Sequence, residues 1–342
     1  MLARSFTEEQ VIFRDAYRKF LTKEIVPSME AWREQGRVGR EAFTAAGKHG
    51  FLMVWPSEKH GGMGDADFRF EQVIIEETAY ARCSDWFNTL HSRLVGPYLT
   101  RFGSIDQQDE FLPKCTSGQY ILAIAMTEPD AGSDLAGMRS RAKKDGDDWV
   151  LNGQKTYISN GINADLVIVA AKTGGDDKPH EMTLFLVEKG AQGFERGRNL
   201  KKMGLKGQDT SELFFNDVRV SPSHVLGEPG KGFYYLMEGL AEERLIGACQ
   251  YLSQAQLSFD LTLQFVKERN IFGKKVADFQ NTQFKLAELR TDLDIAQTFV
   301  DQCVAAQNAG LLTPVDAAKA KYHTSELQVR AAALGVQLHG GS

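Results

Sequence analysis

The spacing of apolar residues changes twice along this chain, and this change limits the folds that the chain can adopt. From about residue 7 to residue 117 apolar side chains recur at helical spacing, with breaks at prolines and at a glycine-rich loop. Between residues 121 and 226 the pattern becomes short β-branched and aromatic runs, separated by turn pairs such as Asn152-Gly153. From residue 233 onwards the helical spacing returns. A chain with separate blocks of helices and strands does not form a sheet of alternating strands and helices.

We therefore predict three domains. They are an N-terminal helical domain (1–120), a middle antiparallel β-barrel or β-sandwich (121–228) and a C-terminal antiparallel helical bundle (229–342). The bundle should contain three long helices, at about 233–270, 281–307 and 314–337. No G-x-G-x-x-G segment joins a strand to a helix, so we do not expect a Rossmann-type nucleotide site.

Composition and charge argue against several classes of protein. The 342 residues are 42% hydrophobic and 25% charged, which is typical of folded globular proteins. The formal net charge of −5 does not suit a nucleic-acid-binding protein. The longest apolar runs, 121–126 and 166–171, are much shorter than the roughly 20 residues of a membrane-spanning helix. The first residues resemble neither a signal peptide nor a presequence, so we expect a cytoplasmic protein, or one already processed.

The cysteines and histidines give no metal signal. The cysteines are scattered and form no C-x-x-C pair, so we expect buried thiols at Cys83, Cys115, Cys249 and Cys303. The seven histidines show none of the short spacings of metal-binding helices. We therefore expect metal-free chemistry.

Two segments of the middle domain could hold a flat polar ligand. Residues 126–134 leave an apolar strand and gather hydroxyls, a proline and a glycine in one tight loop, which offers N–H groups and small donors. The alternative is an ordinary Asx or Ser turn. Further on, Tyr157 and Ser159 lie two residues apart on one face of a predicted strand. That pattern is equally compatible with cross-strand packing.

A carboxylate in the first long helix of the bundle is a candidate base. At about 100° per residue, Glu238 and Glu242 share one face, which we expect to be solvated. Glu243 instead lies on an apolar stripe with Leu236 and Tyr251, where a carboxylate faces packing rather than water. The alternative is a buried glutamate held by an arginine.

The whole chain resembles the acyl-CoA dehydrogenases. The resemblance rests on AMTEPDAGSD at 125–134, NGQK at 152–155 with YISNG at 157–161, RNIFG at 269–273 and QLHGG at 337–341. These motifs occur in the order and in the α–β–α layout of that family. The resemblance implies FAD as cofactor, an acyl-CoA thioester as substrate, electron-transferring flavoprotein as acceptor and a homotetramer.

The resemblance also assigns residues to the cofactor. Those expected to bind FAD are Met126, Thr127, Gly132, Tyr157, Ile158, Ser159, Arg269, Phe272, Gln280, Gln337, Gly340 and Gly341. Arg269 and Gln280 would reach the FAD of a neighbouring subunit. Tyr157 replaces the Trp that is usual in the family, and Ser159 replaces a Thr, so both positions keep their chemical type.

The position of the base points to one branch of the family. Short- and medium-chain members place their catalytic glutamate near the C-terminus, whereas long-chain and isovaleryl members place it before an arginine within a helix. Glu243 and Arg244 match the second arrangement, and residues 202–215 look most like the long-chain branch. The resemblance also implies substrate contacts at Ser133, Phe233, Leu240 and Arg244.

The implied reaction is the α,β-dehydrogenation of a long-chain acyl-CoA to the trans-2-enoyl-CoA, with Glu243 as the base. Isovaleryl-type, oxidase-like and non-catalytic flavoproteins of the same fold are the alternatives. The family pattern continues into a further helical segment beyond the QLHGG motif, so we expect the C-terminal bundle to be incomplete.

Overall fold

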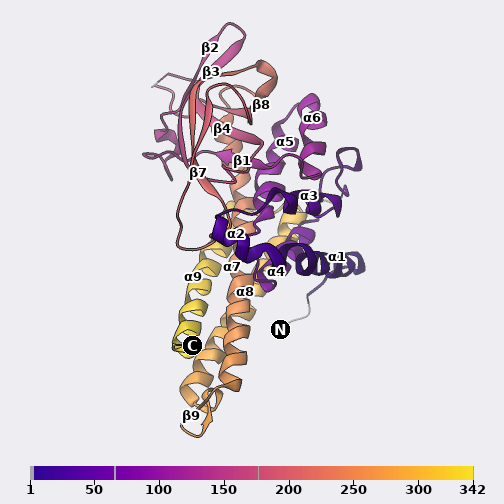
Figure 1. The fold of residues 1–342 in the computed structure, drawn as a ribbon, viewed down its shortest axis with the longest axis vertical. Coiled ribbons are helices and arrows are strands. Elements are labelled where there is room, and N and C mark those ends of the chain that lie inside the picture. The colour runs from indigo at the N-terminus through magenta and orange to yellow at the C-terminus, as the bar shows by residue number, and fades with distance from the viewer. Residues whose placement is uncertain (1–3, 65–66, 176, 342) are drawn as a thin grey trace. The chain divides into compact units, whose positions relative to one another are not determined.

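The computed structural model describes residues 4–64, 67–175 and 177–341, and these residues form two units (Figure 1). The first, which we call the β unit, comprises residues 20–64 and 83–239. The second, the helical unit, comprises residues 4–19, 67–82 and 240–341. Along the sequence, the order of helices, then strands, then long helices confirms the predicted fold class, but the expectation of an antiparallel middle domain is wrong because one of its strands pairs in parallel with two others. The three predicted domain boundaries stay predictions.

The strands of the middle region form one mixed sheet. Within the described residues its order is β6-β7-β3-β2-β4-β5-β8, and β1 pairs with β4. The bounds are β1 Leu122–Ala125, β2 Arg141–Asp145, β3 Asp148–Ser159, β4 Leu166–Lys172, β5 Met182–Glu188, β6 Phe194–Asn199, β7 Thr210–Val220 and β8 Val225–Leu226. β4 runs parallel to β1 and β2, and the other pairs are antiparallel. The parallel pairs arise because β1 and β2 reach β4 through long segments rather than through hairpins.

Both faces of β4 are buried, which explains its uninterrupted apolar sequence. Ile168 packs into a core shared with helical residues such as Leu99 and Phe111. Its neighbour Val169 faces the opposite core, which also contains Leu151 of β3 and Phe215 of β7. Side chains of β3 and β7 thus pack together with those of β4, and the sheet folds over a core of its own.

Two short helices, α5 Gly96–Phe102 and α6 Ile105–Thr116, pack on the first of these cores. The unit also contains the short helices α2 Met29–Gln35 and α3 Arg40–Lys48. α6 begins with a capping box, in which Ser104 and Gln107 each accept a hydrogen bond from the other's backbone N–H. A π-helical turn at Leu90–Val95 carries His91, whose Nε2 donates to the Cys115 carbonyl at 3.1 Å and whose Nδ1 accepts from the Leu122 N–H at 3.0 Å. His91 thereby joins this turn to α6 and to β1.

The helical unit confirms the three long helices predicted near the C-terminus. Its elements are α1 Glu8–Phe20, α4 Phe68–Tyr80, α7 Gly232–Glu268 (from residue 240), α8 Gln280–Asn308, α9 Pro314–His339 and the hairpin of β9 Asn270–Ile271 with β10 Lys274–Lys275. α8 and α9 lie side by side (Figure 1). α7 joins them through hydrogen bonds from Gln256 to Gln297 at 3.0 Å and from Gln328 to Gln254.

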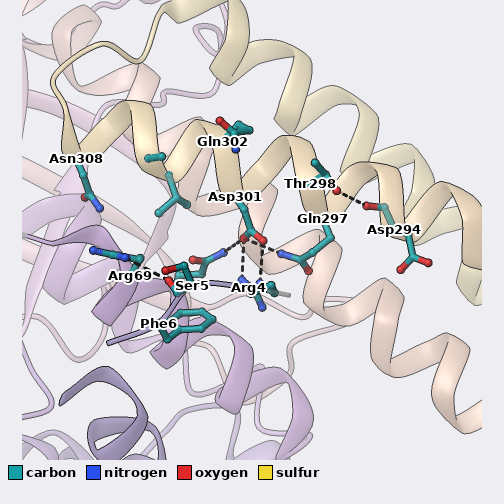
Figure 2. Close-up of a pocket in the computed structure, with 13 residues that line it drawn as sticks. Arg4, Ser5, Phe6, Arg69, Asp294, Gln297, Thr298, Asp301, Gln302 and Asn308 are labelled. Atoms are coloured by element: carbon teal, nitrogen blue, oxygen red, sulfur yellow. Dashed lines mark hydrogen bonds and ion pairs between the residues drawn. The ribbon is translucent and has the colours of Figure 1, made fainter. Parts of the chain in front are cut away.

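The N-terminal segment closes a cavity of about 470 Å³ beside α4 and α8 (Figure 2). Arg4 donates through two nitrogens to Asp301 of α8, each at 2.8 Å, and lies 2.7 Å from Glu76 of α4. Asp301 also accepts from the Gln72 and Gln297 amides at 2.8 and 2.9 Å. One carboxylate therefore ties residues 4–6 to both helices.

Two further expectations can be compared with the structure. All four cysteines are buried and free, as predicted. Among the described residues, none of the helices has the length and apolarity needed to cross a bilayer.

Candidate functional site

The segment that follows β1 carries the first predicted cofactor residues and is fastened to β3. The Thr127 carbonyl accepts a hydrogen bond from the Thr156 N–H at 2.9 Å. The buried Lys155 ammonium donates to the Met126 carbonyl at 3.1 Å and to Glu128 Oε1 at 2.8 Å. The structure thus holds residues 126–128 against β3, immediately before Tyr157.

Tyr157 presents an open aromatic surface next to this segment. The β3–β7 pairing shifts register between Lys155 and Ile158, and Tyr157 adopts a left-handed φ of 58° at this irregularity. Its side chain is 68% exposed. A left-handed backbone at a bulky residue costs roughly 1–3 kcal/mol and is concentrated at functional sites, so it points to a role for the exposed ring.

These residues fit the ring of a flavin. Within the part of the chain that the structure describes, the hydroxyls of Thr127, Tyr157 and Ser159 have no protein hydrogen-bond partner, while Thr127 and Ser159 are half-buried. A flat heterocycle needs an apolar or aromatic surface to lie on and a few donors at its edge. Tyr157 offers the first and the hydroxyls offer the second.

The other predicted residues near this segment lie differently. Ile158 is only 3% exposed and packs in the sheet's own core, so only its backbone can reach a ligand. Gly132 and Ser133 are exposed, and a Cβ added at Gly132 would meet nothing within 4 Å. Glu128 and Ala131 exchange backbone hydrogen bonds at 2.9 and 3.2 Å, so a backbone turn closes this part of the loop.

α7 carries the candidate base, Glu243, and buries a neighbouring glutamate that the sequence pattern assigns to solvent. Glu242, expected on a solvated face, is only 5% exposed, whereas Glu238 is exposed. Glu243 and Arg244 are half-buried. The expectation for Glu242 is wrong because α7 is covered nearly all round at this turn, with buried residues both on the stripe and off it.

The predicted substrate residues of α7 are half-buried as well. Phe233 lies in the β unit, with its ring centroid 4.5 Å from that of His180. Leu240 belongs to the helical unit and is also half-buried. Each of these side chains therefore retains some accessible surface for a ligand within its own unit.

The remaining predicted cofactor residues gather near one end of the helical unit. Phe265 stacks on His339, with centroids 4.2 Å apart, so the end of α7 adjoins the end of α9. Arg269 and Phe272 follow α7, and Gln280 opens α8. The last three predicted residues lie at the end of α9 or just after it, and all are exposed: Gln337, Gly340 and Gly341.

Three comparisons with known proteins agree with these observations. Residues 7–119, 123–218 and 230–342 match the families described as "Acyl-CoA dehydrogenase, N-terminal domain", "middle domain" and "C-terminal domain". The long-chain specific acyl-CoA dehydrogenase, mitochondrial, of Rattus norvegicus is 47% identical over 342 residues, which cover 99% of this chain and 79% of that protein.

The chain belongs to the acyl-CoA dehydrogenase family.

Other members of the family are similar in sequence or in structure. The isovaleryl-CoA dehydrogenase, mitochondrial, of Pongo abelii is 35% identical over 98% of this chain and 80% of its own length. A crystal structure of an acyl-CoA dehydrogenase from Geobacillus kaustophilus superposes with a TM-score of 0.96, at 46% identity over 99% of this chain and 90% of that one. A glutaryl-CoA dehydrogenase from Mycobacterium smegmatis, solved in complex with FADH2, has a TM-score of 0.90 at 27% identity and covers 98% of this chain and 85% of that one.

This acyl-CoA dehydrogenase is thus a flavin-dependent oxidoreductase of fatty acid metabolism that uses FAD and acts on an acyl-CoA. Sequence reasoning gave no separate role to Lys155 and Glu128, although both fall within the quoted motifs. The available signal was a charged residue, Lys155, in a strand that also carries the apolar residues Leu151 and Ile158.

Proposed function

We propose that this acyl-CoA dehydrogenase oxidises long-chain fatty acyl-CoA thioesters to trans-2-enoyl-CoA products. The observation that carries the proposal is the 47% identity, over 99% of the chain, to long-chain specific acyl-CoA dehydrogenases of three mammals. The second candidate is a branched-chain activity, which the 35% identity to an isovaleryl-CoA dehydrogenase supports. A glutamate followed by an arginine in α7 is compatible with both.

Glu243 is the proposed catalytic base. The thioester carbonyl makes the neighbouring α-hydrogen acidic, and the Glu243 carboxylate takes this proton. FAD, when bound, supplies the acceptor for the β-hydrogen and its electron pair. Thr127, Tyr157 and Ser159 hold and orient the flavin ring.

Ser133, Phe233, Leu240 and Arg244 are proposed to bind the acyl-CoA. Their side chains range from half-buried to exposed, so each offers contact area to a ligand.

Glu243→Gln tests the base, with Glu242→Gln as the matched control on the same turn of α7. Anaerobic addition of a long-chain acyl-CoA should bleach the flavin absorbance of the wild type and of Glu242→Gln. Glu243→Gln should bind FAD but lose bleaching by at least about 10³-fold, because the proton is no longer abstracted. Bleaching of Glu243→Gln at the wild-type rate would remove Glu243 from this role.

A substrate series tests the chain length. We expect kcat/KM for flavin reduction to rise from C4 to long chains and to be low for isovaleryl-CoA, because each buried methylene contributes about 0.8 kcal/mol. A maximum at isovaleryl-CoA would favour the second candidate. Hydrogen peroxide formed at the rate of substrate oxidation would instead identify an oxidase, whereas turnover only with electron-transferring flavoprotein supports the proposed acceptor.

The hairpin and the long helices support the proposal of a homotetramer. Phe272 at the hairpin tip is 93% exposed and adopts a left-handed φ of 49°. Phe284, Ile295 and Val336 on α8 and α9 are at least 60% exposed. Exposed apolar side chains in such numbers are typical of surfaces that bind another chain. Light scattering of the purified protein should give four times the subunit mass, and a monomer would contradict the proposal.

The cytoplasmic location also stays a proposal.

A further inference from the structure

A buried ion pair lies at the base of the loop that carries Met126, Thr127 and Ser133. Lys155 is 0% exposed and Glu128 is 5% exposed, and their charged atoms are 2.8 Å apart. The ammonium also donates to the Met126 carbonyl at 3.1 Å and lies 3.8 Å from Met138 Sδ. Lys155 therefore contacts residues on both sides of Thr127 and at the far end of the loop.

Glu128 closes the loop from the other side. Its Oε2 accepts from the Arg139 N–H at 2.5 Å, and its Oε1 accepts from the Ser140 N–H at 3.0 Å. These bonds join the residue after Thr127 to the residues that lead into β2. The backbone at Met126 and Thr127 is held directly by two bonds, from the Lys155 ammonium to the Met126 carbonyl and from the Thr156 N–H to the Thr127 carbonyl.

Such a pair is costly, so its presence needs a reason other than stability. Burial lowers the pKa of Lys155, because it disfavours the charged ammonium. Burial acts to raise the pKa of Glu128, but the Lys155 charge and the N–H donors outweigh it and hold the pKa below its usual value. Apolar residues of similar size often stabilise a fold as well as a buried ion pair does. What apolar residues cannot supply is the directed bond to the Met126 carbonyl.

We propose that Lys155 and Glu128 are positioning residues of the flavin site: the pair sets the backbone of Met126 and Thr127 against Tyr157 in the arrangement that binds FAD. This inference rests on the proposed roles of Thr127 and Tyr157. It adds that two buried residues determine cofactor affinity and reduction potential. The effect acts through Met126 and Thr127, whose backbone groups they hold.

The test separates positioning from stability. The variants are Glu128→Gln, which keeps a carbonyl acceptor but loses the charge, and Lys155→Met with Glu128→Met, which replaces the whole pair by apolar side chains. Arg40→Met is the matched control, because Arg40 pairs with Asp165 at 2.6 Å elsewhere in the same unit. FAD affinity is measured by titration of each apoprotein, the flavin midpoint potential by dye equilibration, and stability by the melting temperature.

We expect FAD to bind at least tenfold more weakly to Glu128→Gln and to the double variant, with a shifted midpoint potential. Arg40→Met should change only the melting temperature. Lys155→Arg, which keeps directed N–H donors, should bind FAD more tightly than the double Met variant does. Wild-type affinity and potential in either Glu128→Gln or the double variant would overturn the inference. Thr127→Ala and Tyr157→Ala test the proposed flavin site separately from the positioning role of the ion pair. If these two variants weaken FAD binding and the ion-pair variants do not, only the positioning role fails. If none of the four variants weakens FAD binding, the proposed flavin site fails as well.

Discussion

His91 should make the stability of the β unit depend on pH. The ring is fully buried, and burial lowers its pKa from 6.5 to about 4, although the Cys115 carbonyl and the nearby Asp165 charge act in the opposite direction. The neutral ring uses both nitrogens, with Nε2 donating to Cys115 and Nδ1 accepting from Leu122. Protonation would place a second N–H against the Leu122 N–H and break this bond.

The sign and size of the effect follow from linkage. Between pH 6.5 and about 4 the unfolded chain binds a proton at this histidine and the folded chain does not, so stability falls as the pH falls through this window. With these two pKa values, the folded state should lose about 2 kcal/mol between pH 7 and pH 5 through His91 alone. Above about pH 6.5 the contribution is fully present.

The assay compares wild type with His91→Gln, which cannot be protonated in this range. Urea unfolding of both proteins at pH 7 and pH 5 cancels the titration of the groups that they share. We expect wild type to be more stable at pH 7 and its advantage to shrink by about 2 kcal/mol at pH 5. An advantage that is the same at both pH values would refute the reasoning.

Three further substitutions test the helical unit. Arg4→Met should lower the stability of this unit by about 1–3 kcal/mol, because Asp301 and Glu76 lose a guanidinium but keep other partners. Arg18→Met is the control, since Arg18 is 58% exposed in its ion pair, and it should cost less than about 1 kcal/mol. Equal losses of stability in thermal unfolding of the two variants would contradict this difference. Phe272→Asn relieves a left-handed aromatic residue and should stabilise the subunit by about 0.5–1 kcal/mol while weakening the tetramer. Sedimentation and melting curves measure both, and an unchanged assembly would argue against a contact at Phe272.

The elements that sequence predicts well are those in which local spacing and tertiary burial agree. α7, α8 and α9 each repeat apolar residues over seven or more turns, so their bounds differ from the predicted ones by at most a few residues. Asn160-Gly161 lies in the predicted turn between β3 and β4, whereas Asn152-Gly153, also expected as a turn, lies inside β3 at a register shift in its pairing with β7. The mixed pairing of β4 could not be predicted, because it depends on which distant strands become neighbours.

The candidate site shows the same limit. The roles of Thr127 and Tyr157 come from motifs, and the structure adds the left-handed backbone at Tyr157 that exposes its ring. A helical wheel assigned Glu242 to solvent because it counts only the residues of its own helix, whereas burial is decided by what packs on that helix. The pair of Lys155 and Glu128, 27 residues apart, depends on the proximity of β3 to the end of β1.

The central claim is that Glu243 removes the α-proton of an acyl-CoA. Exchange of the substrate's α-hydrogen in deuterated water, followed by mass spectrometry of the recovered acyl-CoA, measures that step without an electron acceptor. The wild type and Glu242→Gln should incorporate deuterium at the α-carbon, and Glu243→Gln, loaded with FAD, should not. Deuterium incorporation by Glu243→Gln at the wild-type rate would contradict the account.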